Sequence, residues 1–380
     1  MGQGAGHQGS HGERERQERH VPTVAPAQSG RQFSVVSVLY AGAMESPPTP
    51  AAVHGGTCAI VGLPNVGKST LLNRVLSRHI AAVSPRPQTT RNRILGIHRA
   101  TVEELDPPAV ELCFVDTPGI QIGKGALRRF MRDQALGAAG DCDVALYVAD
   151  SLDPHGNGPD RLSQSDAADL GTAVAGVPLV VALNKVDRIA KPELLPLIDR
   201  WVKWGAATGR SDLHVVPIGA LSGENVDHLV ATIARLLPVG PAMFPVDMVT
   251  DRAEEFLAGE LVREQLYLQL GKELPYAAAV MIETFEERER GDLAIGACIV
   301  VERESQKAIV IGKGGARVKQ LGIAARQALS ELFRCQVHLN LFVKVVPDWS
   351  NADAGLRKVG FADLAGGGKR NNGTSGGGGS

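Results

Sequence analysis

The stretch Gly62-Leu-Pro-Asn-Val-Gly67-Lys68-Ser69-Thr70 decides the fold of the first half of the chain. It follows the apolar run Thr57–Gly62, which predicts a β-strand, and it opens the segment Lys68–Leu76, which predicts a helix. Glycines at this spacing let backbone N–H groups surround phosphate oxygens, and the N-terminus of the helix adds its dipole. The pattern Gly-x-x-x-x-Gly-Lys-Ser therefore predicts a loop that binds the phosphates of a nucleotide.

The polar side chains of this loop suit two different tasks. Lys68 can place a positive charge against the β- and γ-phosphates, and the Ser69 hydroxyl can coordinate Mg²⁺. The residues of the loop that we predict to bind a nucleotide are Gly62, Asn65, Val66, Gly67, Lys68, Ser69 and Thr70.

Two shorter motifs each end a predicted strand. Asp116-Thr-Pro-Gly119 offers a carboxylate that can hold Mg²⁺ through water and a glycine backbone that can sense the γ-phosphate. In Asn184-Lys185-Val-Asp187 the last carboxylate can accept from the N1–H and N2–H₂ edge of guanine, while Asn184 and the stem of Lys185 brace the base. Ligands of open α/β sheets bind at the carboxyl ends of the strands. The three motifs in this order therefore predict a guanine-nucleotide site.

Strand-like and helix-like segments alternate through residues 57–237, which predicts an α/β fold with a mostly parallel sheet and helices on both faces. The predicted strands are Thr57–Gly62, Val110–Asp116, Asp143–Asp150, Val177–Asn184 and Leu213–Ile218. The predicted helices are Lys68–Leu76, Leu127–Ala139, Lys191–Trp204 and Val226–Leu237.

The composition divides the chain into five parts. Residues 1–55 are dominated by Gly, Gln, His, Ser and Pro and predict a disordered tail. We expect the α/β domain over residues 56–237 and a Pro- and Gly-containing linker over residues 238–249. A smaller α+β domain is expected over residues 250–365, and a flexible Gly- and Ser-rich tail over residues 366–380.

The smaller domain carries a second glycine-rich loop, Gly312-Lys313-Gly314-Gly315, before a predicted helix, Ala316–Phe333. Such a loop leaves no side-chain bulk against a nucleic-acid backbone and can clamp a short single strand. Between Arg303 and Val345 eight Lys or Arg residues stand against two Glu, in a chain whose net charge is −1. This local basic excess indicates contacts with RNA phosphates. The residues predicted to bind RNA are Gly312, Lys313, Gly314, Gly315, Arg317 and Lys319.

The rest of this domain is predicted to contain a long amphipathic helix, Ala253–Leu270, and three strands, Ala277–Phe285, Ala294–Val301 and Gln336–Val346. Over the whole chain of 380 residues, 44% are apolar and 21% are charged, which is ordinary for a globular protein. The longest apolar runs are only as long as a strand, which argues against a membrane-spanning protein. The five scattered cysteines predict free thiols.

The chain resembles the Era family of translation-factor-like GTPases. The resemblance rests on Asn65 in the first loop, on Pro87-Gln-Thr-Thr-Arg91 after it, and on the smaller second domain. The resemblance covers residues 57–364 and implies a P-loop GTPase domain followed by a type II KH domain. It implies hydrolysis of GTP to GDP and phosphate, with Mg²⁺ as the cofactor. It also implies that Thr90 caps the γ-phosphate and Mg²⁺ as the threonine of switch I, with Thr89 as the runner-up.

The resemblance assigns roles and partners. The magnesium ligands would be Ser69, Thr90 and Asp116, and the residues acting on the reaction would be Lys68, Thr90 and Gly119. Asn65 stands where the family places a potassium ligand; the alternative is that Asn65 only stabilises the tight loop. The RNA would be the 3′ end of small-subunit ribosomal RNA, and the role would be assembly of the small ribosomal subunit. The location would be the cytoplasm, with peripheral contact to the inner face of the cell membrane as a further family trait.

Two positions depart from what related GTPases show. The base-bracing loop, usually Ser-Ala in this family, is Gly219-Ala220 here, so a backbone contact from Ala220 to the guanine oxygen is expected without the seryl support. Ile120 follows Gly119, where Ras-like GTPases have the glutamine that orients the attacking water. Because isoleucine cannot hydrogen-bond to water, we expect no catalytic role for the Ile120 side chain.

Two other functions are compatible with part of this pattern. The first is a GTPase whose second domain binds a protein in signalling, and the basic Gly-Lys-Gly-Gly loop argues against it. The second is an RNA-binding module with weak or no GTPase turnover. The intact Lys68, Ser69, Asp116, Asn184 and Asp187 argue against that alternative.

Overall fold

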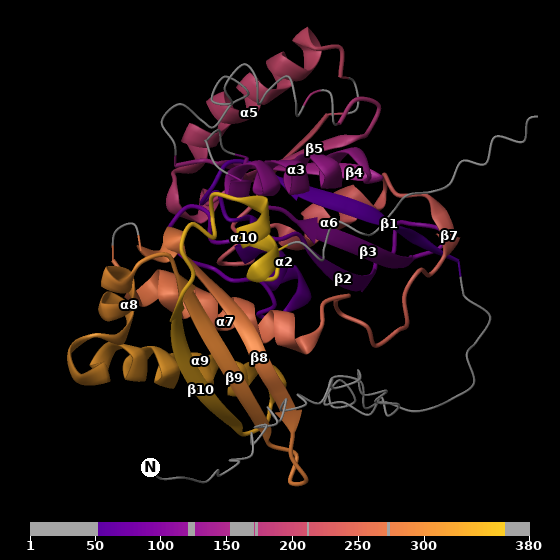
Figure 1. The fold of residues 1–380 in the computed structure, drawn as a ribbon. Coiled ribbons are helices and arrows are strands. Elements are labelled where there is room, and N and C mark those ends of the chain that lie inside the picture. Colours follow the sequence, from indigo (N-terminus) through magenta and orange to yellow (C-terminus); the bar gives the residue numbers. More distant parts are fainter. Residues whose placement is uncertain are drawn as a thin grey trace, which may run out of the picture. The chain divides into compact units, whose positions relative to one another are not determined.

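The computed structural model of the chain describes residues 52–120, 126–152, 171, 174–210, 213–271 and 274–361 (Figure 1). Most of the predicted N-terminal tail and all of the predicted Gly- and Ser-rich tail lie outside these residues. Within the described residues, no helix is both long enough and apolar enough to cross a membrane. The five cysteines are all described, and all are free thiols.

The first domain is built on a sheet with the strand order β2-β3-β1-β4-β5-β6. All neighbouring strands on this path run parallel, except that β2 is antiparallel to β3. A short strand, β7, pairs antiparallel with β1 off this path. The strands are β1 (Ala52–Val61), β2 (Ile94–Thr101), β3 (Ala109–Asp116), β4 (Val144–Asp150), β5 (Leu179–Asn184), β6 (His214–Pro217) and β7 (Val239–Pro241).

Helices cover both faces of this sheet because successive side chains of a strand point to opposite faces. Cys58 and Ile60 of β1 pack in the cluster formed with helices α2 (Lys68–Leu76) and α6 (Val226–Ala234). The alternate residues of β1 pack in a second cluster, formed with α3 (Ala126–Gly140) and α5 (Lys191–Ala207). The prediction of a mostly parallel sheet between two layers of helices is therefore confirmed (Figure 1).

Two strand boundaries differ from the sequence prediction. β2 was not predicted, because Ile94–Thr101 includes Gly96 and Arg99 and only part of this edge strand is buried. β1 begins at Ala52, so the prediction that residues 52–55 belong to a disordered tail is wrong. These residues are fixed by β7 and by a hydrogen bond from the Gly55 N–H to the Pro238 carbonyl (3.0 Å).

The predicted linker, 238–249, is tied to the sheet by two charged side chains. The buried Glu111 carboxylate accepts from the N–H groups of Met243 (2.5 Å) and Phe244 (3.3 Å). Arg99, which lies opposite Glu111 on the neighbouring strand, donates to the same carboxylate (2.7 Å). Arg99 also donates to three carbonyls of the linker, those of Phe244, Pro245 and Met248. The linker is therefore part of the folded structure rather than a loose tether.

The second domain has a mixed sheet with the strand order β10-β9-β8. β10 runs parallel to β9, and β8 runs antiparallel to it. This topology, with a glycine-rich loop between two helices, confirms the predicted α+β KH domain of type II. The elements are α7 (Glu254–Gln269), β8 (Ala278–Glu287), β9 (Leu293–Val301), α8 (Glu304–Ile311), α9 (Ala316–Phe333), β10 (Val337–Val345) and α10 (Asp353–Lys358).

The two faces of the second sheet have different neighbours. Ile295 and Ile299 of β9 pack with α7 and α9 in the core of the second domain. Cys298 and Val300, on the opposite face, pack with Leu127 of α3 and with residues near α10. The first domain therefore contributes a helix to the packing of the second sheet, and the domains share buried surface.

Replacing Glu111 with alanine should lower the free energy of unfolding by about 3 kcal/mol, because two linker N–H groups and Arg99 lose their buried acceptor. Glu104→Ala, at an exposed position in the turn after β2, should change it by less than about 0.5 kcal/mol. Urea unfolding of the two variants measures the difference. Equal stabilities for both variants would contradict the structural role given to the linker.

Candidate functional site

The loop between β1 and α2 has a backbone that only glycine accommodates at two points. Gly62 and Gly67 have φ angles of 147° and 103°. A Cβ atom at Gly67 would lie closer than 3.0 Å to the side-chain nitrogen of Asn184, and one at Gly62 would lie 2.5 Å from the carbonyl oxygen of Val148. The loop therefore packs backbone directly against two neighbouring strands, as the sequence pattern predicts.

Lys68 lies folded into this loop. Its ammonium group donates to the carbonyls of Gly62 (3.1 Å) and Leu63 (2.9 Å), and the residue is 6% exposed. Burial lowers the pKa of Lys68 to about 8, and nearby Asp116 opposes this shift. The Lys68 ammonium therefore lies against the backbone of the loop, beside the place where the phosphates would bind.

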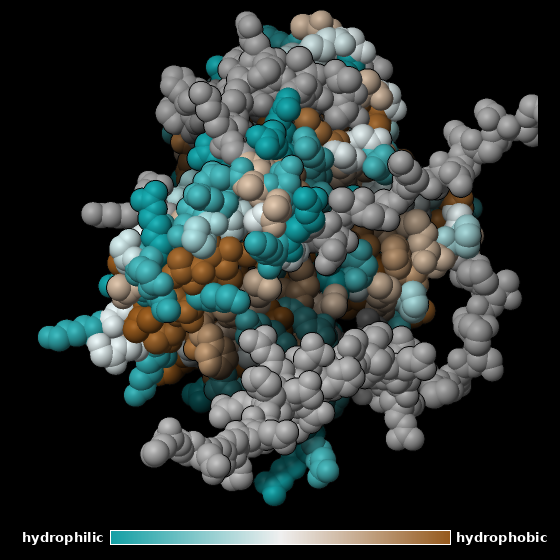
Figure 2. Space-filling model, in the orientation of Figure 1, coloured by the Kyte–Doolittle hydropathy of each residue, from teal (hydrophilic) through white to brown (hydrophobic). Residues whose placement is uncertain are grey.

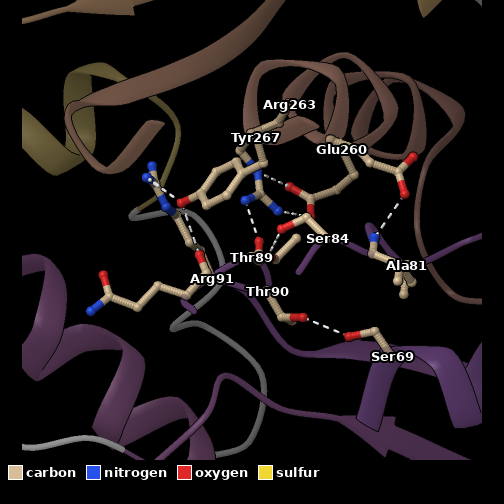
Figure 3. Close-up of polar contacts among 12 residues, drawn as sticks. Ser69, Ala81, Ser84, Thr89, Thr90, Arg91, Glu260, Arg263 and Tyr267 are labelled. Atoms are coloured by element: carbon tan, nitrogen blue, oxygen red, sulfur yellow. Dashed lines mark hydrogen bonds and ion pairs between the residues drawn. The ribbon is translucent and has the colours of Figure 1, made fainter. Parts of the chain in front are cut away.

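Ser69, Thr90 and Asp116 bring three oxygen ligands together, and Figure 3 shows the contact between Ser69 and Thr90. The Ser69 hydroxyl lies 2.6 Å from the Asp116 carboxylate and 2.7 Å from the Thr90 hydroxyl. The other carboxylate oxygen of Asp116 is buried and has no partner among the described residues. Hydroxyl and carboxylate oxygens are the ligands that Mg²⁺ prefers, so this cluster fits the predicted magnesium site.

The buried side chain of Asn184 links three loops. Its amide nitrogen donates to the Val66 carbonyl (2.7 Å) in the phosphate loop. Its amide oxygen accepts from the N–H groups of Lys185 (2.8 Å) and Ala220 (2.9 Å). Lys185 adds a second link, because its ammonium donates to the Asn65 carbonyl (3.0 Å). The predicted base-binding motifs are thus joined to the phosphate loop.

Asp187 and Ala220 lie at the base end of the site, and both line the same pocket as the phosphate loop. Asp187 is exposed, so its carboxylate is accessible to a ligand. The Ala220 N–H donates to Asn184. That these two residues read the guanine edge stays a prediction, and their placement in one pocket is compatible with it.

Gly219 leaves space that another residue of the chain fills. A Cβ atom at position 219 would lie closer than 3.0 Å to the Ser222 hydroxyl and 2.9 Å from the Asp187 carboxylate. The Ser222 hydroxyl itself donates to the Gly219 carbonyl (3.2 Å) and accepts from the Glu224 N–H (3.3 Å). Ser222 therefore braces the loop from within, a role that the sequence analysis missed because no motif marks this position.

Gly119 and Ile120 sit against the phosphate loop. A Cβ atom at Gly119 would lie 2.8 Å from Pro64, so the backbone approaches the loop closely. The Ile120 N–H donates to the Gly62 carbonyl (3.1 Å), and its side chain is buried in the core. That the Ile120 side chain takes no part in the reaction stays a prediction.

Most of the predicted nucleotide residues line one pocket, and three lie just behind it. The three residues outside the lining are Gly62, Val66 and Asp116. Each is hydrogen-bonded to a lining residue: Gly62 to Lys68, Val66 to Asn184, and Asp116 to Ser69. The lining also includes residues that sequence reasoning did not name, among them Ala82, Val83, Ser84 and Pro85. They precede the Pro87-Gln-Thr-Thr-Arg91 motif and carry no signal of their own.

The residues predicted to bind RNA form a separate group around the loop between α8 and α9. Gly312, Gly314 and Gly315 have φ angles of 73°, 59° and 78°, and a Cβ atom at Gly314 or Gly315 would meet nothing within 4 Å. Lys313 is exposed, and within the described residues it has no acidic partner. The loop is therefore open to a ligand. Arg317 reaches back to the Ile309 carbonyl (2.8 Å), whereas Lys319 is exposed.

Comparisons with known families match the two domains separately. The family model described as a 50S ribosome-binding GTPase matches residues 57–185, and that of the KH domain matches residues 273–350. GTPase Era of Xylella fastidiosa is 45% identical over 308 residues, covering 80% of this chain and 97% of the relative. GTPase Era of Geotalea daltonii is 40% identical over 314 residues, covering 82% of this chain and 99% of the relative.

Two solved structures are similar over both domains, each at 36% identity. A variant of Aquifex aeolicus Era bound to GDP and AlF4⁻ has a TM-score of 0.72 and covers 81% of this chain and 99% of its own. Era in complex with MgGDPNP and nucleotides 1506–1542 of 16S ribosomal RNA has a TM-score of 0.73, with 82% and 99% covered.

The fold and the pocket define a P-loop GTPase that carries a C-terminal KH domain. At this identity and coverage, the chain belongs to the Era family of GTPases.

The affinity for Mg²⁺ should depend on pH through Asp116. Burial raises the pKa of this carboxyl group to about 6, while Lys68 and hydrogen bonds from Ser69 and Thr90 oppose the shift. A proton and Mg²⁺ compete for the carboxylate, so the affinity should fall about tenfold per pH unit below this pKa and level off above it. Magnesium titrations of the GDP complex well below and well above the pKa measure the change.

Asp116→Asn provides the control for the pH dependence, since the phosphates of GDP titrate in the same range. In this variant only the titration of the nucleotide remains, so the pH dependence should be clearly flatter. The assignment fails if wild type and Asp116→Asn share one pH profile.

Introducing the usual family serine at Gly219 should weaken GDP binding in this chain rather than improve it. The new side chain would collide with the Ser222 hydroxyl, and overpacking of this kind costs about 1–3 kcal/mol. Ser222→Ala in the same chain should recover most of the loss, because it removes the colliding oxygen. Binding measurements on Gly219→Ser, Ser222→Ala and the double variant test this, and tighter binding by Gly219→Ser alone would contradict it.

Proposed function

We propose that this chain is a GTP-hydrolysing switch that binds single-stranded RNA, the 3′ end of small-subunit ribosomal RNA, during assembly of the small ribosomal subunit. The observation that carries the proposal is the Gly-Lys-Gly-Gly loop, with its exposed Lys313, on a chain that also has a pocket lined by most of the predicted nucleotide residues. The similar Era structure with MgGDPNP and a 16S ribosomal RNA segment supports both halves of the proposal.

The surface around the loop has the two properties that single-stranded RNA requires. Lys313 and Lys319 supply charge for phosphates. Ile309 of α8 and Ile323 of α9 are 47% and 50% exposed and offer apolar surface to bases. Figure 2 also shows apolar side chains over β10, where Phe342 is 56% exposed, bordered by hydrophilic ones. A base can lie against such surface while its phosphates face the lysines.

The nucleotide pocket supports slow hydrolysis. Lys68, Thr90 and Gly119 line the pocket, so Lys68 would bind the β- and γ-phosphates, and the Thr90 hydroxyl and Gly119 backbone would contact the γ-phosphate. Ser69, Thr90 and Asp116 would hold Mg²⁺, which would supply positive charge to the phosphates. The buried Ile120 cannot orient water, so the pocket positions the phosphates without a glutamine of the Ras type.

Potassium is a second part of the proposal, resting on Asn65. This residue has a φ angle of 64°, and its amide nitrogen donates to the Pro85 carbonyl (3.0 Å) in the following loop. The side chain therefore sits between the phosphate loop and switch I, where a monovalent cation would add charge near the phosphates. A role in the tight loop alone is the competing interpretation.

We propose a cytoplasmic location, because GTP and the ribosomal subunit are found there. We also propose peripheral contact with the inner face of the cell membrane, which the family resemblance implies.

The RNA loop is tested by replacing Lys313 and Gly314 with aspartate together, which sets two carboxylates against the RNA backbone. Binding to single-stranded RNA ending in the 3′ sequence of small-subunit ribosomal RNA should be lost, while GDP affinity stays unchanged. Arg326→Asp with Gln327→Asp makes the same change of charge on the exposed part of α9 and should retain most of the binding. Lys319→Ala should lower the salt slope by about 1, as expected for one phosphate contact.

Equal RNA affinity for wild type and the loop variant would overturn the RNA-binding proposal. That result would favour a GTPase whose second domain binds a protein. An RNA-binding wild type that releases no phosphate from GTP would instead favour the RNA-binding module without turnover.

Hydrolysis should be faster in potassium than in sodium at the same ionic strength, and Asn65→Ala should remove the difference. Intrinsic turnover is slow, about 10⁻⁴ per second, even in Ras, which has the water-orienting glutamine, so an effect of added charge should be visible. Phosphate release in the two salts measures the ratio. Rates that agree in the two salts would leave Asn65 with its role in the loop alone.

A further inference from the structure

Four polar residues of α7 lie on one face of the helix and are all buried. Glu260, Arg263, Glu264 and Tyr267 are spaced by three and four positions, which places them on one stripe. Each is less than 9% exposed, so the face that an amphipathic helix would turn to water is covered. We refer to these four residues as the polar stripe of α7. What covers the stripe is the segment 79–91 of the first domain, which contains switch I.

Two residues of the stripe hold the backbone directly before Thr90 (Figure 3). The Arg263 guanidinium donates to the Thr89 carbonyl, and the Tyr267 hydroxyl donates to the Gln88 carbonyl (2.9 Å). Glu260 accepts from two nitrogens of the same guanidinium, one of them at 2.9 Å, and so fixes its orientation. Two consecutive carbonyls of switch I are therefore held by the second domain.

Glu264 holds the start of the same segment. Its carboxylate accepts from the Val83 N–H (2.8 Å) and lies 3.0 Å from the ring nitrogen of His79. The hydrogen bond with Glu264 raises the pKa of His79. The stripe thus contacts the segment at both ends.

The side chain directly after Thr90 is also held by the second domain. Arg91 is 1% exposed, so its guanidinium is shielded from water. It donates to the Ala278 carbonyl (2.7 Å) and to the Pro275 carbonyl (3.0 Å), and it lies over the ring of Trp349. The Tyr267 hydroxyl accepts a further hydrogen bond from it (3.0 Å).

Thr90 itself turns the other way, toward Ser69 and Asp116. Its neighbours on both sides are fixed to the second domain, so the position of its hydroxyl in the magnesium site depends on contacts outside the first domain. We propose that the polar stripe of α7 positions Thr90, so that the KH domain supplies the residues that complete the GTP-bound arrangement of the nucleotide site.

The chemistry of the stripe favours a positioning role over a purely stabilising one. A buried ion pair such as Glu260 with Arg263 adds little net stability compared with apolar residues of similar size. What it provides is a fixed direction for each donor, because a guanidinium held by two hydrogen bonds can point its remaining nitrogens only one way. The proposal rests on the function proposed above, since Thr90 matters only if the pocket takes GTP.

The first test uses the full chain with Glu260→Gln and Arg263→Met combined, which removes both charges at nearly constant volume. The turnover number for GTP should fall about 10- to 100-fold, as expected when a group in the site is misplaced by about 1 Å. GDP affinity should stay within about twofold, because GDP lacks the phosphate that Thr90 contacts. A loss of general stability would lower the affinity for both nucleotides together.

Tyr267→Phe is the milder variant, since it removes one hydroxyl and keeps the ring. It should lower turnover in the same direction without changing GDP affinity. Tyr147→Phe is the matched control, because Tyr147 is a buried tyrosine of the first domain whose hydroxyl has no partner among the described residues. This control should leave turnover unchanged.

Thr90→Ala decides whether the effect passes through Thr90. In that background the stripe variants should cause little further loss, because coupled residues are not additive. Full additivity, or unchanged turnover in folded stripe variants, would overturn the proposal. The affinity for a non-hydrolysable GTP analogue relative to GDP gives the same answer without turnover. A wild type that binds GTP but does not hydrolyse it would therefore contradict the proposed function and leave the role of the polar stripe testable by binding.

Discussion

The site depends on one buried amide, that of Asn184. Its three hydrogen bonds join the carbonyl of Val66 in the phosphate loop to the N–H groups of Lys185 and Ala220 at the base end. An amide can do this because it carries donors and an acceptor on a short, rigid group. The same closeness explains Gly67, since a side chain there would meet the Asn184 nitrogen. The predicted phosphate-binding and base-binding loops are therefore joined by a single side chain.

The nucleotide pocket and the Gly-Lys-Gly-Gly loop differ in how many contacts they make within the chain. The polar groups of the nucleotide pocket are bonded within the chain: Lys68 donates to the Gly62 carbonyl, and the Ser69 hydroxyl donates to one oxygen of Asp116. The Gly-Lys-Gly-Gly loop is open at Gly314, where an added Cβ atom would meet nothing within 4 Å. Between them lies α7, whose polar residues face switch I while its apolar residues join the core of the second domain.

Much of the fold and site could be predicted from local patterns. The bounds of α2 and α9 agree with their predictions, and the phosphate-loop residues lie together because a strand, loop and helix are contiguous in the chain. The missed elements lack a local signal. β2 is an edge strand with a mixed sequence, α8 is short, and Ser222 becomes important only because Gly219 leaves space beside it. The order of the linker depends on a buried pair, Arg99 with Glu111, that no spacing rule marks.

The sequence by itself determined the chemistry of the chain: a phosphate loop, a guanine motif and a glycine loop, each encoded within about ten residues. The reason is that these sites use backbone N–H groups and side chains at fixed short spacings, which covalent geometry sets. Only the tertiary structure decided that the polar face of α7 is buried rather than solvated and that it meets Gln88 and Thr89. Contacts between residues more than 170 positions apart depend on how the two domains pack, and amphipathic periodicity shows which residues share a face without showing what covers it.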